Sequence, residues 1–117
     1  SHRFWPLREF ADHESASLDN IRTPEALEAD QMVLGWWERG DHRAVIEFQA
    51  EYRRHAPEGF FGHYLMMVGA IGGTECGAVG RRYSEYESAA GTGQVHVWFE
   101  KPTEGWTAQS QKSQNAD

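Results

Sequence analysis

Six histidines and one cysteine are the side chains of this sequence that most readily bind metals or carry protons. No two histidines stand at the i, i+4 spacing of a zinc-protease helix, and Cys76 has no second cysteine for a structural zinc site. We expect Cys76 to be a small packing residue rather than a nucleophile. His42 follows a predicted helix cap and is expected at the surface, and His96 is expected on the polar face of a strand.

Glu58 is the carboxylate with the most informative surroundings, because it lies at the entrance to the apolar, glycine-rich segment 64–73. A carboxylate in apolar surroundings requires a cation or several donors, since an unpaired buried charge is costly. Two roles stay open: a metal ligand, or a helix cap that contacts the exposed amides and the dipole. A mononuclear iron site needs one carboxylate and two histidines. The proline and glycine beside Glu58 prevent a compact triad with His55 and His63, so the histidine ligands are expected from elsewhere.

Two helices are predicted ahead of Glu58. Thr23 is a capping residue, Pro24 occupies the first helical position, and apolar residues follow at helical spacing until Gly40. Asp41 can cap a second helix that ends near the basic pair 53–54. The short connection predicts two antiparallel helices.

The second half of the chain predicts a buried helix and then two strands. Segment 64–73 is apolar on all sides, which is typical of a helix buried all round. Segments 79–87 and 94–100 are strand-like, and the glycines of 91–93 suit a turn with positive φ between them.

Composition limits the classes of function. At 117 residues the chain is one domain or a piece of one, and its net charge of −7 argues against nucleic acid or an anionic membrane as a partner. No apolar run reaches the length that crosses a bilayer. A single cysteine suits a reducing cytoplasm. The opening residues, serine and histidine followed by bulky aromatics, are typical of a domain interior, so we expect a domain whose N-terminal part is absent.

Three segments together resemble one family. Segment 1–4 (SHRF), segment 57–59 (PEG) followed by His63, and segment 91–95 (GTGQV) stand in the order found in class III extradiol ring-cleavage dioxygenases. The similarity is strongest to the 3,4-dihydroxyphenylacetate (homoprotocatechuate) 2,3-dioxygenases. It covers residues 1–102 and leaves the polar segment 103–117, which is expected to be a disordered tail.

The resemblance implies an α/β fold, in which residues 1–102 form the C-terminal portion of a mixed-sheet, helix-flanked catalytic domain. It implies Fe(II) as the cofactor, with Mn(II) as an alternative metal, and O₂ as co-substrate. Glu58 would be the carboxylate ligand, His2 the acid–base residue and His63 a substrate contact. The two histidine ligands would lie in the absent part, so the chain alone is expected to be inactive.

The implied reaction opens the ring of a catechol beside the diol and yields a muconate semialdehyde. Its partners would be a small aromatic diol and further copies of the chain in a homo-oligomer, in the cytoplasm. Two alternatives stay open. One is a non-catalytic small subunit or binding module, and the other is the same chemistry on another catechol such as protocatechuate or gallate.

Overall fold

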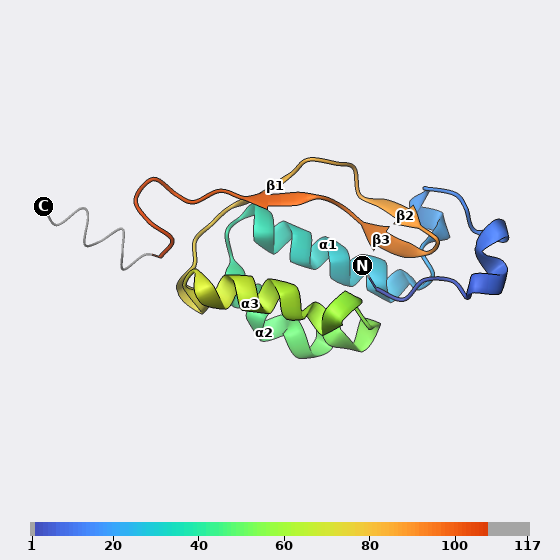
Figure 1. Ribbon diagram of the computed structural model, residues 1–117, viewed down its shortest axis with the longest axis horizontal. Helices are drawn as coiled ribbons and strands as arrows, with labels where there is room; N and C mark the ends of the chain where they lie inside the picture. The colour runs from blue at the N-terminus through green and yellow to red at the C-terminus, as the bar shows by residue number, and fades with distance from the viewer. Residues whose placement is uncertain (1, 108–117) are drawn as a thin grey trace, which may run out of the picture.

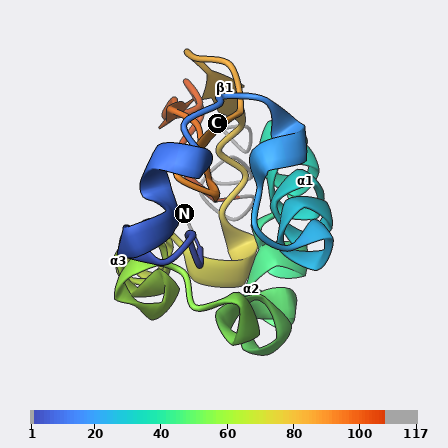
Figure 2. The ribbon, with the colours of Figure 1, turned by 90° about the vertical axis from the view of Figure 1, so that its right-hand side faces the viewer.

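The computed structural model describes residues 2–107, which form a small mixed α/β fold (Figure 1). The α-helices are α1 (Pro24–Glu38), α2 (His42–Tyr52) and α3 (Gly62–Ala70), and the strands are β1 (Gly80–Arg82), β2 (Glu87–Ala89), β3 (Thr92–Gln94) and β4 (Val97–Phe99). In the view of Figure 1 the strands lie above α1, and α2 and α3 lie below it. Figure 2, seen from the end, shows the strands beside α1 and the helices α2 and α3 side by side beneath them.

The two predicted helices are confirmed at their starts. Pro24 lies in the first turn of α1, although the Thr23 side chain makes no capping hydrogen bond there, and the Asp41 carboxylate accepts a hydrogen bond from the Ala44 amide at the start of α2. Gly40 follows α1 with a φ of +69°, a conformation that glycine adopts at little cost. Gly40 and Asp41 therefore determine where α1 ends and α2 begins.

Each of the two predicted strand segments is divided into two short strands. β1 pairs with β4 and β2 with β3, and both pairs are antiparallel, so residues 2–107 form no mixed sheet. The ladders separate beside Ser84, whose hydroxyl accepts a hydrogen bond from the His96 amide. A side chain thus replaces the neighbouring strand as the partner of this amide.

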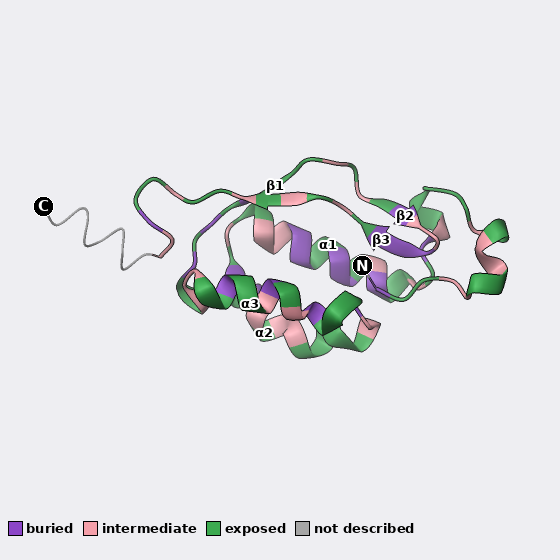
Figure 3. Ribbon diagram, viewed as in Figure 1, coloured by how far each residue is buried: buried purple, intermediate pink, exposed green. Residues whose placement is uncertain are grey.

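The expectation that the apolar helix is buried all round is wrong. Tyr64 and Val68, one turn apart, are the buried residues of α3, whereas Met66 is 75% exposed. Figure 3 shows exposed residues along α3 and along the 3-10 helix Glu58–Phe61 that precedes it. One side of the helix packs on the core, because its neighbours lie on that side only.

The core consists of aromatic and aliphatic side chains from the three α-helices, the segment before β1, and β4. Trp37 is in ring contact with Phe61, Tyr64 and Phe99, with centroids 5.2 to 6.2 Å apart. The buried members of the cluster are Ala29, Val33, Val45, Tyr52, Phe61, Tyr64, Val68, Cys76 and Ala78. This cluster fixes α1 and α3 relative to the strands.

The two ends of the described chain are packed onto this frame. Residues 2–22 contain 3-10 helices at Leu7–Asp12 and Leu18–Asn20. Trp106 packs against the core although it falls within the predicted tail 103–117. Residues 108–117 of that tail lie outside the described residues.

Candidate functional site

His2 is held against strand β3. Its backbone amide donates to Thr92 Oγ1 at 2.6 Å, and the residue is only 2% exposed. Nδ1 lies 3.1 Å from the Arg3 carbonyl oxygen. Nε2 lies 3.0 Å from the Gly93 amide nitrogen and 3.1 Å from Asp30 Oδ2. The predicted acid–base residue is therefore an ordered, buried side chain with a partner at each ring nitrogen.

Asp30 is a buried carboxylate on α1 that accepts from several donors. Tyr52 donates to Oδ1 at 2.6 Å, and Tyr86 donates to Oδ2 through a short hydrogen bond. Burial alone would raise the pKa of Asp30, but the hydrogen bonds from His2, Tyr52 and Tyr86 outweigh it and lower that pKa below its ordinary value. The carboxylate is ionised at neutral pH, and the pKa values of both tyrosines are raised by burial and by its charge.

The glycines of segment 91–93 have two different roles. Gly91 has a φ of +95°, which agrees with the turn predicted from the sequence. Gly93 has no such φ. A Cβ on Gly93 would lie 2.6 Å from Asp30 Oδ2 and closer still to the Tyr86 hydroxyl, so only glycine leaves room for this hydrogen bond.

Two hollows flank this network. The first, which we name the aromatic hollow, has a volume of about 300 Å³, and its walls include Asp30, Trp37, Tyr52, Phe61 and Tyr86. The second, which we name the His2 hollow, has a volume of about 480 Å³, and its walls include His2, Phe4, Phe10 and Thr92. Glu58 and Gln94 border both hollows. The network and the three segments of the resemblance thus meet around one region.

Glu58 begins a strained turn. Gly59, Phe60 and Phe61 follow it with φ values of +64°, +52° and +66°, and non-glycine residues adopt this conformation only at a cost. The Glu58 side chain is exposed, which corrects the expectation that it points into apolar surroundings. It starts a 3-10 helix rather than an α-helix, and α3 begins only after Phe61.

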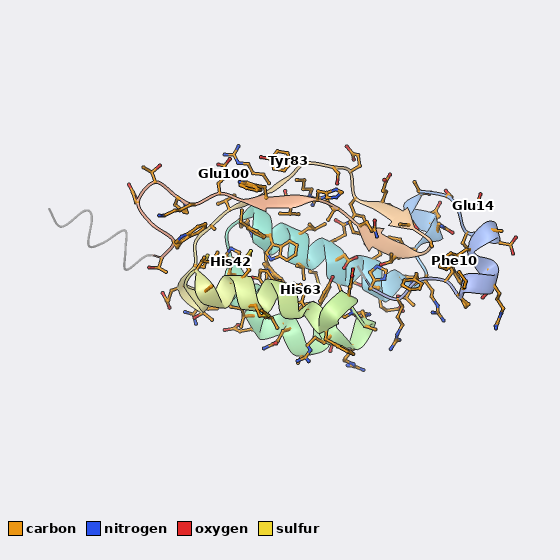
Figure 4. The ribbon with its side chains drawn as sticks, viewed as in Figure 1. Phe10, Glu14, His42, His63, Tyr83 and Glu100 are labelled. Atoms are coloured by element: carbon orange, nitrogen blue, oxygen red, sulfur yellow. The ribbon has the colours of Figure 1, made fainter. Side chains whose placement is uncertain are left out.

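His63, His42 and Cys76 lie outside the two hollows, whereas His96 borders the aromatic hollow. His63 is exposed on α3 (Figure 4), and its ring packs close to Gly59. Within residues 2–107, no three histidine, cysteine or acidic side chains are grouped closely enough to hold a metal ion. Cys76 is buried, as expected for a packing residue, and burial raises the pKa of its thiol.

The expectation that His42 is a surface residue is wrong, because its exposure is 0%. Both ring nitrogens have partners: Nε2 donates to the Ala78 carbonyl at 2.7 Å, and Nδ1 accepts from the Tyr64 hydroxyl at 2.7 Å. Burial lowers the pKa of His42 below its ordinary value, with a partial opposing effect from Ala78 and Asp41. These contacts tie α2 to α3 and to the segment before β1 (Figure 4).

Asp30, Tyr52 and Tyr86 are the site residues that sequence reasoning missed. Asp30 follows Ala29 and precedes Val33 on the buried face of α1, where an acidic residue is unexpected. The position of Asp30 in the sequence therefore indicates a buried carboxylate that needs donors. Nothing in the sequence near Tyr86 indicates its role, because its partner Asp30 is 56 residues away.

Comparison with known proteins identifies no relative: no family model, no curated protein and no solved structure matches the chain. The described residues also contain no helix long and apolar enough to span a bilayer.

Proposed function

We propose that this chain is the C-terminal part of the catalytic domain of an Fe(II)-dependent extradiol dioxygenase, which opens the ring of a catechol such as 3,4-dihydroxyphenylacetate. One observation carries the proposal. His2, Glu58 and Thr92 come from the three segments that resemble this family, and all three border the His2 hollow. Convergence of distant segments on one concave region is typical of a functional site.

The residues fit a metal centre in part. The exposed Glu58 carboxylate can reach a cation at the border of the two hollows, and carboxylate oxygen is a common ligand of non-haem iron. Strained backbone is concentrated at functional sites, and the turn after Glu58 supplies such strain. Residues 2–107 contain no three-ligand group, and in this proposal the two histidine ligands belong to protein outside them.

When bound, Fe(II) supplies a site where the catechol diol and O₂ meet. Phe4 and Phe10 give the His2 hollow an aromatic wall on which a flat ring can pack. In this proposal His2, which borders the His2 hollow, would be the acid–base residue that moves a proton as the ring opens. The carbon–carbon bond beside the diol breaks, and both oxygen atoms of O₂ remain in the product. One ring carbon becomes an aldehyde and its neighbour a carboxylic acid, so no external reductant is needed.

The test uses the full-length protein that contains this chain, loaded with Fe(II) without oxygen. We expect 3,4-dihydroxyphenylacetate to be converted to the coloured semialdehyde, with one O₂ consumed per catechol. Protocatechuate and gallate are run in parallel to identify the ring substituent. Glu58→Gln should lose bound iron and turnover, whereas Glu47→Gln, an exposed glutamate on α2, should lose neither.

His2→Gln separates proton transfer from iron binding. The glutamine amide can still donate a hydrogen bond to Asp30 but cannot carry a proton, so iron should stay bound while turnover falls by at least about 100-fold. Full iron occupancy in Glu58→Gln would refute the ligand role. Binding of the catechols without O₂ consumption would refute the enzyme and favour the non-catalytic binding module.

A further inference from the structure

The ring of His2 has three partners, and they do not agree on its protonation state. A carbonyl oxygen only accepts, so the Arg3 carbonyl requires a proton on Nδ1. The ionised Asp30 also only accepts, and it requires a second proton on Nε2. The Gly93 amide only donates, and it requires Nε2 to be free of a proton. Asp30 therefore favours the charged ring, and Gly93 favours the neutral ring.

These two partners lie at nearly equal distances from Nε2, at 3.1 and 3.0 Å. Because Nδ1 keeps its proton in both states, the change between them involves Nε2 alone. The ring does not have to rotate, since one partner for each state is already in place. This arrangement suits a side chain that gains and loses a proton in each turnover.

The Asp30 carboxylate is itself fixed. Tyr52 from α2 holds Oδ1, and Tyr86 holds Oδ2, the oxygen that also faces His2. Both tyrosines keep their protons at neutral pH because burial and the carboxylate raise their pKa values. They act as fixed donors, and they limit the orientation of the carboxylate and thereby that of the imidazole.

We propose that Asp30 is the positioning residue of His2, and that Asp30 and the Gly93 amide together let Nε2 exchange a proton without ring rotation. This inference rests on the function proposed above, because it assigns the machinery that serves His2. Asp30 is not itself a catalytic residue in this scheme, since its carboxylate acts through the imidazole.

The first measurement does not depend on turnover. The imidazole nitrogen resonances of His2 are recorded at pH 6 in the full chain labelled with ¹⁵N-histidine, and are assigned by their absence in His2→Gln. In Asp30→Asn the Nε2 resonance should move from its position in the parent, because its carboxylate partner is lost, whereas the Nδ1 resonance should stay in place, because the Arg3 carbonyl remains. Identical His2 resonances in the two proteins would overturn the proposal.

The second measurement is kinetic, in the iron-loaded full-length protein. General acid–base catalysis contributes about 10²–10⁴-fold, so misplacing His2 should lower kcat by about 10–100-fold in Asp30→Asn. KM and iron content should stay within about twofold, because neither depends on the position of His2. Glu28→Gln removes the same charge from an exposed position on α1 and should leave kcat unchanged. If kcat falls only in proportion to the fraction of folded protein, Asp30 has a structural role, and the proposal is overturned.

If Asp30→Asn does not fold, Tyr86→Phe tests the positioning role of Asp30 in its place. This variant removes one donor from Asp30 but retains its charge, and it should lower kcat by about two- to tenfold at unchanged KM. An unchanged kcat would contradict the positioning role. If the parent cleaves no catechol, the proposed function fails, and the nitrogen resonances still decide whether Asp30 sets the protonation of His2.

Discussion

Gly93→Ala is the sharpest test of the buried network, because the added methyl group would occupy the place of the Tyr86 hydroxyl. To accept it, Tyr86 must move and lose its hydrogen bond to Asp30. A hydrogen bond to a charged group contributes about 1.5–3 kcal/mol, and overpacking costs about 1–3 kcal/mol more. Replacing glycine by alanine returns about 0.4–1 kcal/mol by restricting the unfolded chain. The expected net loss in the free energy of unfolding is therefore about 2–5 kcal/mol.

Urea unfolding followed by tryptophan fluorescence measures this loss as a lower midpoint at constant slope. Gly69→Ala is the matched control, because a Cβ there meets no atom within 4 Å. That helical, exposed position should gain about 0.5–1 kcal/mol. Tyr86→Phe should cost less in the Gly93→Ala background than in the parent, since the hydrogen bond is already lost there. A loss below about 1 kcal/mol in Gly93→Ala, or full additivity of the two changes, would refute the reasoning.

Two further predictions concern stability. Burial holds the pKa of His42 below its ordinary value near 6.5, so in mild acid the unfolded chain binds a proton that the folded chain does not. The free energy of unfolding should therefore fall by up to about 1.4 kcal/mol per pH unit as the pH drops below 6.5. His42→Gln should flatten this dependence in urea titrations at pH 5 and 7, and an unchanged slope would contradict the assignment. Phe60, 63% exposed at a φ of +52°, should tolerate glycine with a gain of up to about 1 kcal/mol. Phe61→Gly should instead lose about 3 kcal/mol or more of core packing, and equal effects of the two substitutions would count against the strained turn.

The elements that could be predicted from the sequence are those whose signals are local. The proline at the first helical position fixes its own φ, and the Asp41 side chain accepts from an amide three residues further on, so both helix starts follow from the neighbouring sequence. The turn at Gly91 belongs to the same class, because its positive φ is a property of one residue.

The burial of α3 and of His42 could not be predicted in this way. Apolar composition states what a helix can bury, but the number of its faces that are covered depends on elements far away in the chain. The surface prediction for His42 failed for the same reason. The ring is satisfied by Tyr64 and Ala78, which are 22 and 36 residues away, and a polar side chain with two such partners is stable inside a core.

The Asp30 network could be predicted from the sequence only in part. An acidic residue on the buried face of α1 indicates that donors must exist, because an ionised carboxylate is not buried without them. The sequence does not say which donors, since His2, Tyr52 and Tyr86 reach Asp30 from three separate parts of the chain. Gly93 then follows from the network rather than from its own φ, because its missing side chain is the space that the Tyr86 hydroxyl requires. A buried charge on a helix face is thus the feature that links the local pattern of α1 to the distant residues that hold His2.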